Sequence, residues 1–217
     1  VHHTNEIAQS EAVTGQQFSR YWIHANHIKV NGEKMSKSLG NIYTLNEITG
    51  KGFDLQAFKL MVLSKQYGTE GNFTWEILEA AQNRLNHWQE VADLRWQLEQ
   101  KPEAETIETS DFVSELQKVL QNNLDTPAAL AVIDASFNFY ESERIAPTRE
   151  FLDKIIDTLG INLLLPDISD EQKSQLSQRQ TARDDQNWVE SDRLRDELLQ
   201  QGIRINDTSA GQIWSRV

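Results

Sequence analysis

The sequence predicts a mainly α-helical protein, with an antiparallel helical bundle in its middle and a small α+β unit at its C-terminus. Apolar residues between Trp75 and Leu98 recur near helical spacing, with glutamate and glutamine between them. Capping residues mark the starts of further helices beyond residue 110. Alternating apolar residues follow Gly202 and indicate a terminal hairpin. Several helices in succession are typical of a bundle.

The N-terminal quarter combines a helix, a strand and a tight turn. Residues 2–14 are mostly good helix formers, and Gly15 is placed to end the helix. The stretch that ends at Val30 is typical of a strand, and Asn31-Gly32 signals a hairpin turn.

Two short helices are expected next. Thr44 as N-cap and Glu47 three residues later have the spacing of a capping box, and Gly50-Lys51-Gly52 interrupts that helix. Residues 57–64 have the apolar pattern of a buried helix, and the turn-rich stretch 67–72 breaks the chain.

The middle of the chain supplies the bundle. One long helix is expected over 74–100, followed by a loop over 101–110. Asp111 is expected to cap the next helix, and Thr126 and Pro127 the one after, as N-cap and first helical residue. A last bundle helix covers 151–159 and ends at Gly160.

Breaks near residues 67 and 166 divide the chain into three expected parts. These are residues 1–66, residues 67–166 with the bundle, and residues 167–217. In the last part, polar helical sequence runs from Glu171 to about Glu190, and Gly202 is placed to stop the helix that carries Trp188. Residues 203–207 with 212–216 predict a hairpin around Ser209-Ala210-Gly211.

Composition excludes several classes of protein. A hydrophobic share of 38% and a charged share of 25% are ordinary for a soluble domain, and no apolar run is long enough to span a membrane. We therefore expect a cytoplasmic protein. The absence of cysteine excludes a disulfide framework. A net charge of -12 argues against general nucleic-acid binding, so any RNA contact needs a local basic face, for which the arginine-rich final quarter is the candidate.

The densest chemical motif is the stretch from Lys34 to Ser38. Two ammonium groups three residues apart, interleaved with the hydroxyls of Ser36 and Ser38, suit a short loop that closes over a polyphosphate. Lys34 and Lys37 can then stabilise charge on a leaving pyrophosphate. The alternative is a solvated turn of lysine and serine.

Two other sets of side chains share a helical face. His2 and Glu6 are four residues apart, as two metal ligands or a surface pair would be. Trp188, Asp192 and Arg195 combine an aromatic plate, an acceptor and a cationic fork, which are groups that read an unpaired base. The alternative for Trp188 is a packing residue beside an exposed ion pair.

Four motifs along the chain resemble those of one enzyme family. Lys34 to Ser38 spells the KMSKS signature of class I aminoacyl-tRNA synthetases. The segments His2–Ala12, Asn123–Ala131 and Ala182–Trp214 resemble segments of the cysteinyl-tRNA synthetases, in the order of that family. The sequence is therefore similar to the C-terminal part of a cysteinyl-tRNA synthetase. The upstream histidine motif of the class I ATP site does not occur in it.

The resemblance implies a role for each part. Residues 1–66 would end a Rossmann-type catalytic domain, 67–166 would be the helical bundle, and 167–217 would bind the anticodon. The enzyme would use ATP with Mg²⁺ to activate cysteine and transfer it to tRNA-Cys. His2 and Glu6 would join two cysteines, absent from this sequence, around Zn²⁺. The residues that the resemblance assigns to the anticodon are Arg183, Trp188, Asp192, Arg195 and Asp207.

Two alternatives stay open at this stage. A related ligase of mycothiol biosynthesis shares the zinc and the signature loop, but would not need the Arg183, Trp188, Asp192 and Arg195 set. A non-catalytic helical binding module is the other alternative. With the upstream motif missing, we expect this chain alone to be inactive in adenylate formation, and we expect a monomer. His3 is assigned to packing or to the lining of a substrate pocket. Trp22, His24 and His27 could face the adenylate site, and the alternative for them is an aromatic edge of the core with exposed histidines.

Overall fold

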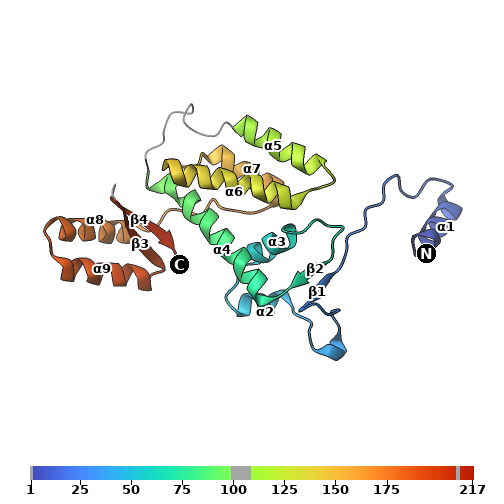
Figure 1. The fold of residues 1–217 in the computed structure, drawn as a ribbon, viewed down its shortest axis with the longest axis horizontal. Coiled ribbons are helices and arrows are strands. Elements are labelled where there is room, and N and C mark those ends of the chain that lie inside the picture. Colours follow the sequence, from blue (N-terminus) through green and yellow to red (C-terminus); the bar gives the residue numbers. More distant parts are fainter. Residues whose placement is uncertain (1, 99–108, 209–210) are drawn as a thin grey trace.

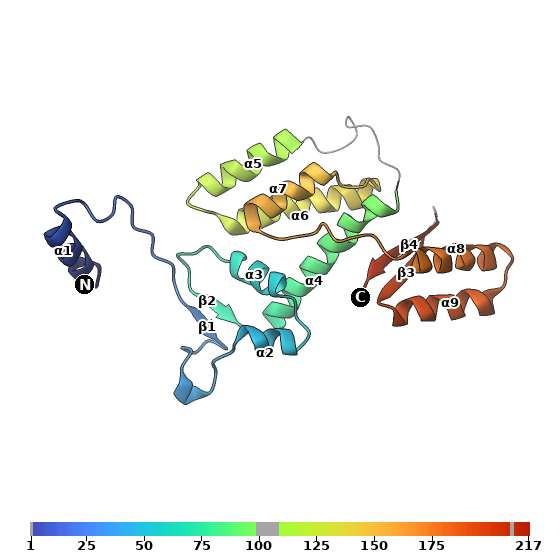
Figure 2. The same ribbon diagram turned by 180° about the vertical axis from the view of Figure 1, so that it is seen from behind.

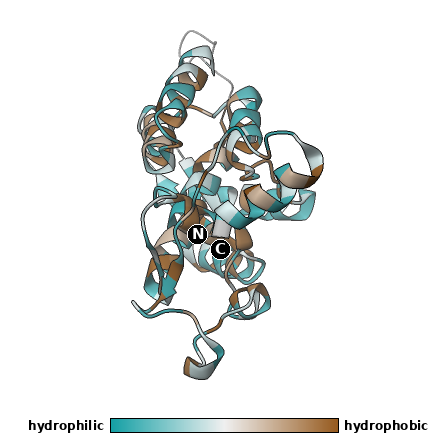
Figure 3. Ribbon diagram, turned by 90° about the vertical axis from the view of Figure 1, so that its right-hand side faces the viewer, coloured by the Kyte–Doolittle hydropathy of each residue, from teal (hydrophilic) through white to brown (hydrophobic). Residues whose placement is uncertain are grey.

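The computed structural model describes residues 2–98, 109–208 and 211–217, and for His2 only the backbone. This part of the chain is mainly helical. Figure 1 shows α1 at one end of the molecule, a central group of helices around α4, and a unit of two helices and a hairpin at the other end. The hydrophobic segments of the helices alternate with hydrophilic ones along the ribbon (Figure 3). No described helix is long and apolar enough to span a lipid bilayer.

The elements follow one another in a simple order along the sequence. The helices are α1 (His2–Thr14), α2 (Leu45–Gly50), α3 (Leu55–Leu63), α4 (Trp75–Ala92), α5 (Thr109–Gln121), α6 (Thr126–Glu143), α7 (Arg149–Leu159), α8 (Asp170–Asp184) and α9 (Trp188–Gln200). The 3-10 helices are η1 (Lys37–Leu39) and η2 (Asp93–Trp96). The strands are β1 (Ile28–Val30), β2 (Gly71–Phe73), β3 (Ile203–Thr208) and β4 (Gly211–Arg216).

A short parallel sheet lies between α1 and the central helices. β1 pairs with β2, and Ile28 lies opposite Gly71. The sequence pattern indicates only a break at 67–72, because a strand of three residues with glycine and asparagine carries no clear alternation. Asn31 and Gly32 both have positive φ, as a tight hairpin turn requires. The expected hairpin is nevertheless only a single bridge from Val30 to Glu33.

The helices that follow begin with side-chain caps. Thr44 and Glu47 form the predicted capping box at the start of α2. Asp54 caps α3, which therefore starts two residues before the expected position. α3 packs against α4, and both contribute to one hydrophobic core that also includes the bundle helices.

α4 is the central helix of the molecule, and Figures 1 and 2 show it passing between the sheet and the bundle. Its predicted apolar face is buried, and Trp88 stacks on Phe137 of α6 at 5.5 Å between ring centroids. The Trp88 indole donates a hydrogen bond of 2.9 Å to Asp134, which also pairs with Arg84 at 2.9 Å. The expected extension of this helix to residue 100 is wrong. α4 ends at Ala92, because the following residues bond to other parts of the chain.

The bundle differs from expectation in how its helices begin. α5 already includes Thr109, so Asp111 lies in its first turn and is not its cap. The N-cap of α6 is Asp125 and not Thr126, because the Asp125 carboxylate accepts the bond from the Ala128 amide at 3.0 Å. α7 ends at Gly160 as predicted. The expected loop over 101–110 lies mostly outside the described residues.

The last unit has a small core of its own. α8 and α9 pack against each other, and α9 packs on β3 of the antiparallel hairpin β3–β4. Leu198, Ile205 and Trp214 are buried at its centre, with Ile168 and Ile203. The hairpin is confirmed, although Ser209 and Ala210 of its turn lie outside the described residues.

Candidate functional site

The loop from Lys34 to Gly40 follows β1 and is the light-blue loop below that strand in Figure 1. The Ser36 hydroxyl caps η1 by accepting a hydrogen bond of 3.3 Å from the Leu39 amide, and lies 3.2 Å from the Ser38 hydroxyl. Gly40 ends η1 in a left-handed conformation with φ of 62°. The two serines therefore shape the loop by local hydrogen bonds.

Asn41 holds the two halves of this loop together. Its amide oxygen accepts a bond of 2.8 Å from the Ser36 backbone N–H, and its amide nitrogen donates one of 3.2 Å to the Lys34 carbonyl. Asn41 was not among the residues predicted from the sequence to shape this loop. The available signal was its position directly after the loop glycine, since asparagine often bonds to nearby backbone.

The two lysines of the loop present their charges to solvent. Both Lys34 and Lys37 are exposed, and neither side-chain ammonium group makes a hydrogen bond or an ion pair with any residue that the structure describes. A free ammonium group on a short ordered turn can bind an incoming phosphate as a point charge with rotatable donors.

Aromatic and histidine rings gather beside α1. The His3 ring lies 4.9 Å from that of Trp22 and 4.7 Å from that of His24. The extended segment after α1 brings these rings together, and Phe18 lies 5.9 Å from Trp22. His27 lies next to β1, and its carbonyl accepts a bond from the Gly71 amide. A role of these rings in a substrate pocket stays a prediction.

The residues implied for zinc do not form a site by themselves. His2 and Glu6 both lie in α1, and Glu6 is exposed. Among the side chains that the structure describes, those of residues 3–98, 109–208 and 211–217, no three or more of His, Cys, Asp or Glu are grouped so that they could hold a metal. Zinc takes four ligands in a structural site and three protein ligands in a catalytic one. Two ligands on one helix therefore do not satisfy the ion.

At the other end of the molecule, Asp207 on β3 is surrounded by arginines of α8. Arg179, which is completely buried, donates two hydrogen bonds of 2.9 Å to the two carboxylate oxygens of Asp207. It donates a third, also of 2.9 Å, to Gln212 on β4. Arg183, one turn further along α8, donates to the same carboxylate at 3.0 Å. The hydrogen bonds from Arg179 hold the pKa of Asp207 below its usual value, and the charges of Arg183 and Arg195 act in the same direction.

Trp188 lies on the first turn of α9, next to the Arg183 side chain that pairs with Asp207. The Trp188 side chain is 56% exposed, and the guanidinium of Arg183 lies 5.9 Å from its ring centroid. Asp192 and Arg195 form an exposed ion pair of 3.1 Å on the same helix. The structure thus gathers Arg183, Trp188 and Asp207, with Arg195 close enough to act on the Asp207 charge.

The alternative for Trp188, a residue that packs in the core, is not what the structure shows, since the core of this unit uses Trp214 instead. Arg179 and Gln212 are the residues that sequence reasoning did not assign. Arg179 precedes Arg183 by one helical turn, and this spacing was the available sign that both reach one partner.

Comparison with known proteins identifies the family. Residues 1–83 match the model of the tRNA synthetases class I (C) catalytic domain, and residues 165–214 match the cysteinyl-tRNA ligase anticodon binding domain. A cysteine–tRNA ligase of Streptococcus agalactiae is 34% identical over 216 residues, which are 99% of this chain and 47% of the relative. One from Solibacter usitatus is 33% identical over 237 residues, covering 99% of this chain and 50% of the relative.

A solved structure, the ternary LeuRS-tRNA-LeuAMS complex of Agrobacterium radiobacter, aligns with a TM-score of 0.47 at 16% identity, over 63% of this chain and 20% of that one. The chain spans about half the length of the curated relatives it matches. Since the two family models match separate regions and these relatives match almost all of it, the chain belongs to the cysteinyl-tRNA synthetase family.

Proposed function

We propose that this chain is part of a cysteine–tRNA ligase that activates cysteine with ATP and transfers it to tRNA-Cys. The observation that carries the proposal is the gathering of Arg183, Trp188 and Asp207 in the region that matches an anticodon binding domain. A loop with two free lysines lies far from it, in the region that matches a catalytic domain (Figure 1). A tRNA has the same division, since its anticodon and its acceptor end lie at opposite ends.

The signature loop would act in the first of two steps. The cysteine carboxylate attacks the α-phosphorus of ATP, and pyrophosphate leaves. Lys37, assisted by Lys34 and by Mg²⁺, would stabilise the charge that develops on the leaving phosphates. Ser36 and Ser38 would keep the loop in shape. In the second step a terminal ribose hydroxyl of the tRNA attacks the adenylate carbonyl, and AMP leaves.

His2 and Glu6 would contribute two ligands to a Zn²⁺ site whose cysteines are not in this chain. Zinc, when bound, favours a thiolate over a hydroxyl and so separates cysteine from serine. By itself this chain would not form cysteinyl-adenylate. Cysteine-dependent pyrophosphate exchange catalysed by the pure chain would contradict this. We also propose that the protein is a monomer and acts in the cytoplasm.

The anticodon would be read by the C-terminal unit. Trp188 offers an exposed ring on which an unpaired base can stack, while Asp192 and Arg195 offer an acceptor and donors for base edges. Arg183 and Asp207 are held in a fixed relation by their ion pair, so they would present a preformed surface to the RNA.

A titration of the chain with tRNA at fixed salt tests this assignment. We would compare tRNA with a GCA anticodon to the same tRNA altered only in the anticodon, for the wild type and for Trp188→Ala. Because stacking of a base on an aromatic ring contributes roughly 1 to 3 kcal/mol, the substitution should weaken binding of the GCA tRNA about tenfold to a hundredfold. Trp22→Ala is the matched control, since Trp22 is also partly exposed but lies near α1. Equal, weak binding of both RNAs by the wild type would refute anticodon reading.

A further inference from the structure

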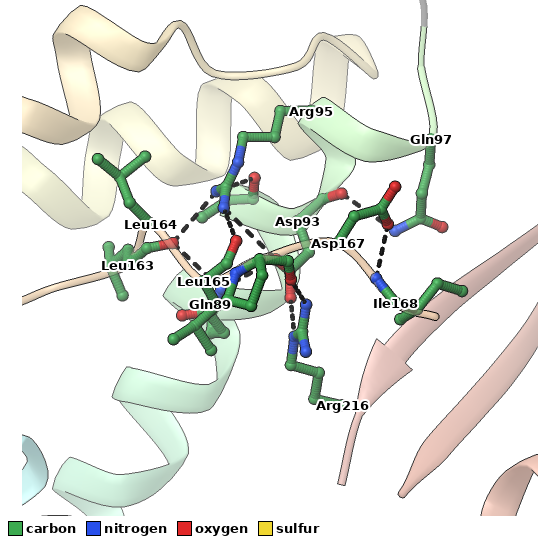
Figure 4. A network of polar contacts seen from close by, with 12 residues as sticks. Gln89, Asp93, Arg95, Gln97, Leu163, Leu164, Leu165, Asp167, Ile168 and Arg216 are labelled. Atoms are coloured by element: carbon green, nitrogen blue, oxygen red, sulfur yellow. Dashed lines mark hydrogen bonds and ion pairs between the residues drawn. The ribbon is translucent and has the colours of Figure 1, made fainter. Parts of the chain in front are cut away.

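The C-terminal unit is joined to the end of α4 by a buried ion pair. Asp93, the first residue of η2, is completely buried. Arg216 of β4 donates a hydrogen bond of 2.8 Å to one oxygen of Asp93, and Gln89 of α4 donates one of 3.0 Å to the other (Figure 4). The carboxylate of Asp93, which directly follows the last residue of α4, is therefore paired with an arginine of β4, the last strand of the chain.

Further hydrogen bonds surround this pair. Gln97 and Trp214 bond to each other twice. The Gln97 amide nitrogen donates to the Trp214 carbonyl at 3.0 Å, and the Trp214 backbone N–H donates to the Gln97 amide oxygen at 2.8 Å. Arg216 also donates to the carbonyl of Pro166. Arg95 donates to the carbonyl of Leu163 at 3.1 Å, so the segment that leads into the C-terminal unit is fixed as well (Figure 4).

These contacts restrict how the two parts can be oriented. The cores on either side are separate clusters, and hydrophobic contact between them has no preferred direction. A buried carboxylate does have one, because leaving it without its partner is costly. Burial raises the pKa of Asp93, and the hydrogen bond and charge of Arg216 oppose that shift, together with the charge of Arg95. Interfaces between domains of one chain are otherwise movable by default.

We propose that Asp93, Gln97 and Arg216 are positioning residues that hold the C-terminal unit, residues 168–217, in one orientation relative to α4. Resting on the proposed function, the consequence is that the anticodon surface and the signature-loop end are presented together to a single tRNA. Two linked sites in a fixed geometry bind one ligand with a high effective concentration, whereas loosely linked sites lose that advantage.

The orientation can be measured without any RNA, because the chain contains no cysteine. Glu79→Cys on α4 and Asp196→Cys on α9 provide two exposed positions for spin labels, and neither side chain makes a hydrogen bond or ion pair within the described residues. Pulsed electron resonance then reports the distance distribution between the two parts. The wild-type background should give one narrow population, and Arg216→Ala should broaden it.

Arg204→Ala is the matched control. Arg204 lies on the partner strand β3 and is exposed, and its side chain makes no hydrogen bond or ion pair in the part of the chain that the structure describes. It should leave the distribution narrow. Gln97→Ala provides a second, uncharged test in case Arg216→Ala unfolds the unit, which circular dichroism would reveal. A narrow, unchanged distribution in folded Arg216→Ala and Gln97→Ala would overturn the proposal.

Binding of RNA tests the consequence. We would measure the affinity of the chain for whole tRNA with a GCA anticodon and for its isolated anticodon hairpin. In Arg216→Ala the affinity for the hairpin should change less than about twofold, while the advantage of whole tRNA over the hairpin should fall about tenfold. An unchanged advantage despite a broadened distribution would refute the coupling. If the wild type binds neither RNA, the proposed function fails, and the distance measurement still decides the orientation.

Discussion

Replacement of Arg179, the buried arginine of the C-terminal unit, should destabilise this unit much more than replacement of its exposed neighbour Arg183. Arg179→Met removes the guanidinium but retains much of the apolar stem. It deletes two bonds to Asp207 and one to Gln212. Hydrogen bonds to charged groups contribute roughly 1.5 to 3 kcal/mol each. Because the Asp207 side chain is 37% exposed, water can replace part of what is lost. We expect the local unfolding free energy to fall by about 2 to 4 kcal/mol.

Arg183→Met is the control, because Arg183 contacts the same carboxylate through a single bond and is 33% exposed. Exposed pairs of this kind contribute less than about 1 kcal/mol, so stability should barely change. Native-state hydrogen exchange can resolve the difference, with the amides of α9 and β3 reporting on the C-terminal unit and those of α4 as an internal reference. If anticodon reading is correct, both variants bind tRNA less tightly.

Two results would refute this reasoning. Equal destabilisation by the two variants would mean that burial of Arg179 does not matter to its ion pair. A stable Arg179→Met would mean that Asp207 and Gln212 are satisfied in another way.

Three further predictions concern other parts of the chain. Asn41→Ala should speed hydrogen exchange at the signature-loop amides without altering overall stability, since it removes both bonds that join the two halves of that loop, and unchanged exchange would contradict this. Asp134→Ala should destabilise the bundle by about 1 to 3 kcal/mol in urea unfolding, because the buried indole N–H of Trp88 loses its acceptor, while Asp134→Asn should cost less. Since the pKa of Asp207 is lowered by Arg179, the stability from this pair should be complete above about pH 4 and fall as the pH drops through that lowered pKa. Asp207→Asn should lose this dependence in acid titrations of unfolding, and an unaltered titration would exclude Asp207 as its source.

Features that depend on nearby residues were predictable from the sequence. The capping box of Thr44 and Glu47, the end of α7 at Gly160 and the buried face of α4 all follow from spacing and residue type. The hairpin β3–β4 follows from alternation after Gly202. In each case the partner that satisfies a group lies within a few residues or on the adjacent strand.

Features that depend on distant residues were not predictable. β2 is defined by its pairing with a strand some forty residues earlier, and its own three residues carry little signal. α4 ends at Ala92 because Asp93 and Gln97 bond to β4, which the helical pattern cannot reveal. The position of Arg179 in the core likewise requires Asp207 to be brought to it by the hairpin.

The length of helix α4 sets the distance between the two ends of the molecule. Its 18 residues correspond to a length of about 27 Å at 1.5 Å per residue. Its first turn follows β2 and its last carries Gln89, so the helix sets both the separation and the rotational phase of the two ends of the molecule. One inserted residue would turn everything beyond it by about 100°. Only an insertion of about two full turns, roughly seven residues, would come close to restoring the original phase, since shorter insertions leave a larger rotation.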